Sequence, residues 1–167
     1  MEPLTALADW AAFYTAQVGA AAALAGLLFV DISLNLNKIL AAPFLPLRAF
    51  LALLLLIAIL ALSSLLLMPG LSQTVAGLGI LVVGAVIWLA GTVIEWIGWR
   101  HRTPQQHVIT FLFNVVLLEA ATIPWLAGGT LVLYGASAGY YWLAGGIILA
   151  FIKAVGDAWV LLVEINR

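Results

Sequence analysis

The chain has 167 residues, of which 66% are hydrophobic and only 8% are charged, and its mean hydropathy is +1.22. Soluble domains are nearer half apolar and a quarter charged, so a water-soluble core is excluded. The net charge of −1 gives no basic surface for nucleic acid, and the lack of cysteine rules out disulfides, thiolate metal sites and a cysteine nucleophile.

Five segments are long and apolar enough to be membrane spans. A span needs about 20 mostly apolar residues to cross ~30 Å of hydrocarbon. The candidate spans cover approximately residues 11–36, 47–68, 74–99, 106–133 and 140–163. Backbone polar groups in lipid need hydrogen-bond partners within the protein, so the spans must be helices or the strands of a closed barrel. The alternation of polar and apolar residues that is typical of a membrane barrel is absent, so we expect helices. The start lacks the basic region of a signal peptide, so we predict one all-α domain over residues 1–167, a five-helix transmembrane bundle.

The positions of lysine and arginine predict the orientation. Lys38 and Arg48 flank the first loop, Arg100 and Arg102 lie in the third, and Arg167 ends the chain. The second loop, the fourth loop and the N-terminal segment carry no lysine or arginine. Because cytoplasmic loops carry the excess of these residues, we predict the N-terminus outside and the C-terminus inside, in a bacterial inner membrane.

The first two spans differ in their polar residues. The first has a face of small residues, for which we predict close helix packing: Gly19, Ala22, Ala23 and Gly26. It also has a polar face, on which Asn35 follows Asp31 by one helical turn toward the cytoplasmic end. Ser63 and Ser64 are the internal polar residues of the second span, which we therefore expect to face lipid.

Glycines recur every seven residues through the third span. They are Gly70, Gly77, Gly84, Gly91 and Gly98. A seven-residue period keeps one stripe toward a partner helix, and glycine lets two backbones approach closely. We therefore predict a helix-packing seam at Gly77, Gly84, Gly91 and Gly98, with Glu95 on the same seam. A helix that slides along a glycine track is the alternative interpretation.

The fourth and fifth spans carry the deepest polar residues. Residues 103–106, Thr-Pro-Gln-Gln, read as a capping box at the start of the fourth span, which also contains Asn114, Glu119 and Pro124. In the fifth span, Lys153 and Asp157 are spaced to pair within one helix. Threading the spans at 1.5 Å per residue places Glu119 and Lys153 near the midplane, where we expect them to pair.

These polar residues form one predicted site. Asp31, Glu95, Asn114 and Asp157 fall at similar depth toward the cytoplasmic side, below the expected Glu119–Lys153 pair. Four acids would then face one lysine, so the unpaired ones must be protonated, hydrated or matched to an external cation. The candidate pathway or buried polar cluster comprises Asp31, Asn35, Glu95, Asn114, Glu119, Lys153 and Asp157. Lys153 would be the counter-ion that controls the protonation of the acids.

Other chemistry has little support in the sequence. His101 and His107 are six residues apart, which is not the spacing of a helical zinc pair. No phosphate-binding glycine loop, haem motif or HExxH motif is present. We therefore expect no enzyme, no catalytic residue, no metal and no cofactor.

Two segments carry a family resemblance. Residues 23–35, ALAGLLFVDISLN, and residues 158–165, AWVLLVEI, resemble a group of small bacterial integral membrane proteins, some of them labelled modulator of FtsH protease. The resemblance covers most of the chain and implies no catalytic or ligand-binding residue. Position 31 is commonly apolar in that group, so Asp31 is particular to this chain.

The sequence leaves two functions open. One is a proton or cation pathway through a homo-oligomer in the lipid bilayer, lined by the intramembrane acids. The other is a non-catalytic accessory subunit that binds another membrane protein, such as a protease or an electron-transfer complex. A third interpretation of the acids is purely structural, as hydrogen-bonded groups that hold the helices together. The number of subunits, the partner and the ion are not set by these patterns.

Overall fold

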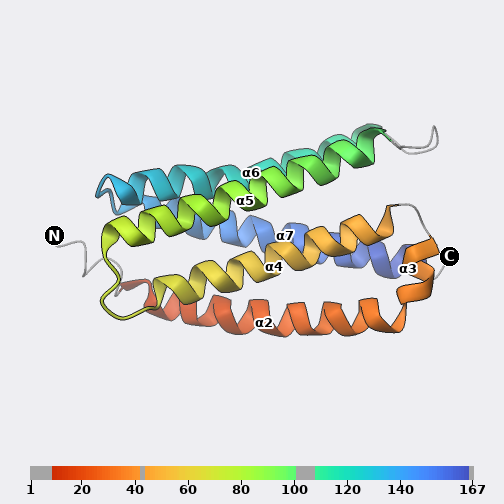
Figure 1. Ribbon diagram of the computed structural model, residues 1–167, viewed down its shortest axis with the longest axis horizontal. Helices are drawn as coiled ribbons and strands as arrows, with labels where there is room; N and C mark the ends of the chain where they lie inside the picture. The colour runs from red at the N-terminus through yellow and green to blue at the C-terminus, as the bar shows by residue number, and fades with distance from the viewer. Residues whose placement is uncertain (1–8, 42–43, 101–107, 166–167) are drawn as a thin grey trace.

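The computed structural model describes residues 9–41, 44–100 and 108–165, and within these ranges the chain forms six α-helices and no strand. In chain order they are α2 (Ala11–Leu34), α3 (Leu36–Ala41), α4 (Leu45–Leu66), α5 (Gln73–Arg100), α6 (Val108–Leu133) and α7 (Ala138–Ile165) (Figure 1). All except α3 are long and apolar enough to cross a membrane. The predicted five-helix transmembrane fold is therefore confirmed, and the protein is a multi-pass membrane protein.

The helix ends agree with the predicted spans to within a few residues. Gly70, between α4 and α5, and Gly135, between α6 and α7, have φ angles of 70° and 86°, a left-handed conformation that glycine adopts without steric cost. Pro124 lies inside α6, which remains helical to Leu133. The predicted capping box at residues 103–106 and both histidines lie outside the described residues.

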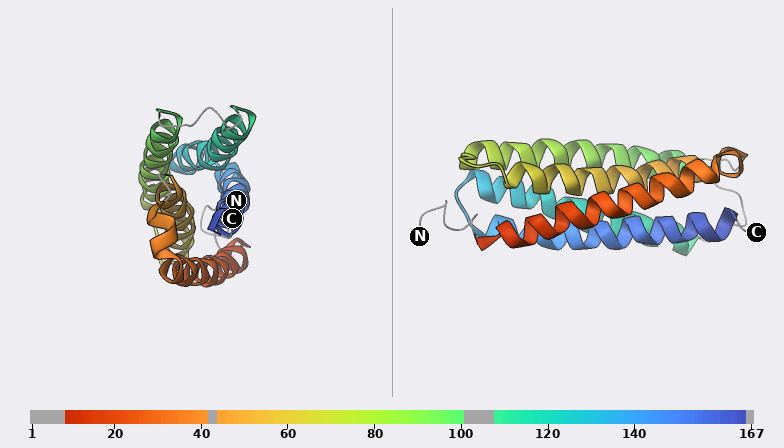
Figure 2. Two further views of the ribbon diagram at one scale, coloured as in Figure 1. Left: turned by 90° about the vertical axis from the view of Figure 1, so that its right-hand side faces the viewer. Right: turned by 90° about the horizontal axis from the view of Figure 1, so that it is seen from below.

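Four of the long helices close into a ring. Helices α4, α5, α6 and α7 run alternately up and down, each packs on the next, and α7 packs back on α4. We call this arrangement the four-helix ring (Figure 2). Helix α2 packs on α4 from outside the ring, at the edge away from α5 and α6. The end of the bundle at which α7 ends and α3 lies is called the C-terminal end (Figure 1).

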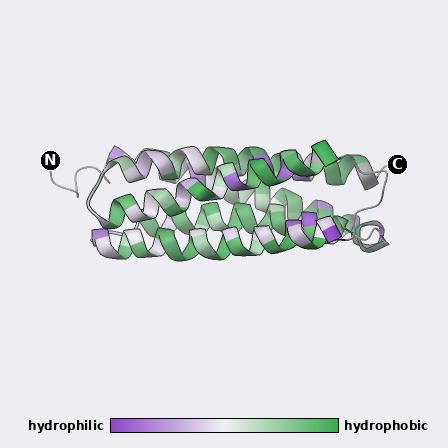
Figure 3. Cartoon of the chain, turned by 90° about the horizontal axis from the view of Figure 1, so that it is seen from above, coloured by the Kyte–Doolittle hydropathy of each residue, from purple (hydrophilic) through white to green (hydrophobic). Residues whose placement is uncertain are grey.

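Helix α4 is central in the bundle, so the expectation that the second span faces lipid is wrong. It contacts α2, α5 and α7, and its buried residues include Leu55, Ile59 and Leu62. All the spans are mostly hydrophobic, with few hydrophilic interruptions (Figure 3). Lipid tails are as apolar as leucine, so a span with few polar residues suits the middle of a bundle as well as its surface.

The glycine seam of α5 lies against α6 over three of its four predicted positions. A Cβ atom on Gly77 would lie 2.8 Å from the backbone nitrogen of Leu133. Gly84 faces Trp125 and Leu126, and Gly91 faces Leu118. Gly98 differs, because a Cβ atom there would meet nothing within 4 Å. The seam ends where α5 and α6 approach the C-terminal end of the bundle.

Helix α2 is attached to the bundle along a narrow line. Its buried residues are Tyr14, Ala21 and Leu28, seven residues apart. Gly19 and Gly26 have no atom within 4 Å of a Cβ position, and Ala22 and Ala23 are exposed. The small-residue face predicted to pack closely therefore points away from the chain's own helices.

Candidate charge cluster inside the four-helix ring

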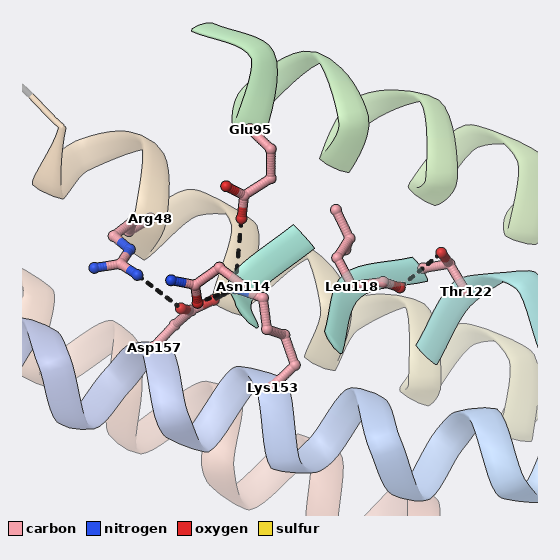
Figure 4. Close-up of polar contacts among 7 residues, drawn as sticks. All are labelled: Arg48, Glu95, Asn114, Leu118, Thr122, Lys153 and Asp157. Atoms are coloured by element: carbon pink, nitrogen blue, oxygen red, sulfur yellow. Dashed lines mark hydrogen bonds and ion pairs between the residues drawn. The ribbon is translucent and has the colours of Figure 1, made fainter. Parts of the chain in front are cut away.

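Five polar side chains converge toward the C-terminal end of the four-helix ring, and each ring helix supplies at least one of them (Figure 4). We call them the charge cluster: Arg48 from α4, Glu95 from α5, Asn114 from α6, and Lys153 and Asp157 from α7. The apolar faces of four helices thus bring together polar residues that lie up to 109 positions apart in sequence. Helix α2 contributes nothing to the cluster.

Lys153 is the centre of the cluster. Its Nζ lies 2.5 Å from Oδ2 of Asp157 and 3.7 Å from Oε1 of Glu95. The same ammonium donates to Oδ1 of Asn114 at 3.4 Å. The predicted pair of Lys153 and Asp157 within one helix is therefore present. The ammonium group thus has two hydrogen bonds and one longer ion pair, and the lysine side chain is only 1% exposed.

Asp157 links the lysine to an arginine. Its Oδ2 accepts from Lys153, while its Oδ1 lies 3.8 Å from Nη2 of Arg48. The carboxylate of Asp157 is 2% exposed, so both of its oxygens are matched to cations inside the ring. Burying a carboxylate is tolerated when it is paired in this way.

The cluster is sealed on one side and partly open on the other. Arg48 is 28% exposed and Glu95 is 16% exposed, and both lie near the ends of their helices at the C-terminal end. Toward the opposite end, the ring is filled by fully buried apolar side chains, including Leu55, Ile59, Leu118 and Ile147. In that region the buried hydroxyl of Thr122 donates to the carbonyl of Leu118 in its own helix (Figure 4).

Two of the predicted acids lie outside the cluster. Asp31 accepts a 3.0 Å hydrogen bond from Nδ2 of Asn35 on the same helix segment. Glu119 accepts a 2.7 Å hydrogen bond from Nε1 of Trp88 on α5. Lys153 has Asp157 and Glu95 as its acidic partners, so the expected Glu119–Lys153 pair is replaced by two separate contacts. Glu119 has the expected depth but a different direction around α6.

Sequence reasoning missed Arg48 as a member of the site. The distribution of lysine and arginine predicts it to be a loop cation, but it lies in the first turn of α4 and reaches Asp157. With Arg48 included, the cluster holds two cations and two acids, so the expected excess of acid is absent from it. The depth of Arg48 in the membrane could have indicated this contact, because Arg48 and Asp157 both lie toward the cytoplasmic end of their predicted spans.

This arrangement can exchange protons and redistribute ion pairs. Glu95 is the acid nearest the open side, and it shares Lys153 with Asp157. Within residues 9–41, 44–100 and 108–165, no group of three or more histidine, cysteine, aspartate or glutamate residues could hold a metal ion. Comparison of the chain with models of protein families, with curated proteins and with solved structures gives no match. The resemblance to the small bacterial membrane proteins therefore stays a prediction.

Proposed function

We propose that the protein carries protons or small cations across a bacterial inner membrane and that the charge cluster is its working site. The observation that supports this proposal is that side chains from all four ring helices converge on the buried pair of Lys153 and Asp157, which are 1% and 2% exposed. Ionisable residues inside the membrane are costly and generally mark ion paths or proton relays. The positive-inside rule assigns the C-terminal end, with Lys38, Arg48 and Arg100, to the cytoplasm.

The cluster would work by exchange of partners around Lys153. A proton or cation that enters past Arg48 reaches Glu95 first, because Glu95 is the less buried of the two acids in the cluster. Neutralising Glu95 weakens its attraction for Lys153, which stays bound to Asp157 at 2.5 Å. The ring helices then lose one of the contacts that join α5 to α7. Onward movement requires the apolar side chains beyond Leu118 to separate and admit water.

Flux measurement in liposomes tests this proposal. The purified protein would be reconstituted, and proton and cation flux would be followed under an imposed potential in the wild type and in Glu95→Gln. Flux in the wild type that the variant loses would support the cluster as the working site. Flux equal to that of empty liposomes would contradict the proposal.

A second candidate function is supported by the outer face of α2. This face carries Gly19 and Gly26 in open space on a helix with only three buried residues. Small residues on a membrane helix permit close approach of another helix. We therefore propose, as the alternative, a non-catalytic accessory subunit whose α2 binds another membrane protein or a second copy of the chain. In that case the charge cluster would hold the ring helices together.

A further inference from the structure

Glu119 lies at the middle of a membrane span and apart from the charge cluster. By the helical rise of 1.5 Å per residue, it is roughly 17 Å from the start of α6 and roughly 21 Å from its end. Its side chain is partly exposed. Val116 and Ile123, one helical turn to either side of it, are exposed on the outer surface of the bundle. The exposed edge of Glu119 therefore meets hydrocarbon at this depth.

The neighbours of Glu119 place it on the seam between α5 and α6. Leu118 and Leu126 of α6 face Gly91 and Gly84 of α5. Ala121, which is about 160° from Glu119 around the helix, lies against Gly146 of α7. Glu119 therefore points along the α5 side of α6, away from α7 and Lys153. There it meets the indole of Trp88, whose Nε1 donates to Oε2 at 2.7 Å.

The charges nearby do not neutralise Glu119. On the helices that pack against α6, the charged side chains of the described residues within the ring are Glu95, Lys153 and Asp157, and these pair with one another. Among the described residues, the polar contact of the Glu119 carboxyl group is with one neutral N–H, that of the Trp88 indole. A carboxylate has about four acceptor positions, so one donor leaves a charge at this place poorly stabilised.

We propose that Glu119 is a proton-binding site that opens to the hydrocarbon at the middle of the membrane. Its Oε2 accepts from Trp88, which leaves Oε1 as the atom at which the proton would bind. The indole thereby fixes the orientation of the acid on the α5–α6 seam. The site differs from the charge cluster, whose acids are matched to cations, and the inference does not rest on the proposed function of that cluster.

A lipid-soluble carbodiimide, dicyclohexylcarbodiimide, tests this inference directly. The carboxyl oxygen bonds to the central carbon of the reagent while the carboxyl proton moves to one of its nitrogens. An acyl shift from oxygen to nitrogen then gives a stable N-acylurea that contains all the atoms of both reactants. The protein in liposomes would be treated, digested and examined by mass spectrometry. Glu119→Gln is the negative control, and Trp88→Phe retains the acid but removes the indole donor.

We expect the reagent to label Glu119 in the wild type and in Trp88→Phe, and we expect complete loss of that label in Glu119→Gln. Glu95 and Asp157 should stay unlabelled in the folded protein. Three results would overturn the inference: Glu119 labelled only after unfolding in detergent, equal labelling of Glu95 and Asp157, or equal labelling of Glu119 by a water-soluble carbodiimide. The last result would mean that the site opens to water.

Discussion

Lys153 Nζ and Asp157 Oδ2 lie 2.5 Å apart one turn along α7, and both side chains are buried inside the four-helix ring. Glu95 and Asn114 approach the same ammonium from α5 and α6, and Arg48 approaches the aspartate from α4. One buried ion pair thus connects all the ring helices. Its energetic role follows from the cost of leaving any single charge without a partner.

Lys153→Met should strongly destabilise the folded protein. Removing one partner of a buried ion pair typically costs about 3–5 kcal/mol, because the remaining charge is uncompensated. Here two acids, Glu95 and Asp157, would lose their shared cation. Thermal unfolding in detergent, followed by circular dichroism, measures the loss.

The double variant Lys153→Met/Asp157→Leu is the matched control. It retains one cation and one acid, Arg48 and Glu95, so the cluster stays neutral. We expect it to be more stable than Lys153→Met alone, since apolar residues of similar volume often replace a buried pair without loss. A double variant that is less stable than the single one would contradict this account of the cluster.

Gly77→Ala should weaken the contact between α5 and α6. Its new methyl group would lie 2.8 Å from the backbone nitrogen of Leu133, which cannot move without shifting α6. Overpacking of this kind typically costs about 1–3 kcal/mol.

Gly98→Ala is the control for the seam, because its methyl group meets nothing within 4 Å. Alanine is favoured over glycine in a helix by about 0.5–1 kcal/mol, so this variant should be equally stable or slightly more stable. Unfolding curves of both variants in the same detergent decide the matter. Equal destabilisation by the two substitutions would exclude a seam that ends before Gly98.

Ser63→Ala should cost nothing in stability. The Ser63 hydroxyl is fully buried, and the described residues offer it no hydrogen-bond partner. Removing an unsatisfied polar group spares its desolvation. Thr122→Val is the contrast, since Thr122 donates to the Leu118 carbonyl and its loss should cost about 1 kcal/mol. A marked loss on Ser63→Ala would mean that a water molecule or another group binds this hydroxyl.

Cysteine at Gly19 or Gly26 should report contacts made by the outer face of α2. The chain has no cysteine of its own, so a single introduced thiol can form a disulfide only between chains. Such a bond needs Cα atoms within about 7 Å of each other. If α2 binds a second copy, oxidation in the membrane should give a dimer band on a non-reducing gel. Val82→Cys is the control, because the Val82 side chain is exposed on α5. Equal crosslinking at this position would indicate random collision between chains.

The helices could be predicted from the sequence, whereas their neighbours could not. Length and hydropathy located the five spans to within a few residues. They could not show that α4, the most apolar span, lies at the centre. Hydropathy separates membrane from water, but it does not separate lipid from the interior of a membrane protein.

Depth along each helix was also predictable, but direction around it was not. Glu95, Asn114 and Asp157 were expected at one level, and they meet there. Asp31 is predicted at the same level and Glu119 is predicted closer to the midplane, paired with Lys153. Instead, Asp31 contacts Asn35 and Glu119 contacts Trp88. A rotation of about 160° around α6 separates Ala121, which lies against α7, from Glu119, which contacts Trp88 on α5. Only the packing of the glycine seam fixes that rotation.

We propose that ions pass through the charge cluster and that Asp31, which lies outside it, is not needed for their passage. Asp31→Asn is the matched control for Glu95→Gln, because both replace one acid by its amide. Asp31 has its hydrogen bond to Asn35 and lies outside the cluster. Variants would be compared only where the purified protein keeps its helical content and its unfolding temperature.

Proton and cation flux in liposomes under an imposed potential is the most direct measurement. We expect flux in the wild type, retained flux in Asp31→Asn and loss of flux in Glu95→Gln. No flux above empty liposomes in the wild type, or equal loss in both variants, would contradict it. The accessory function of α2 would then be the better explanation of the fold.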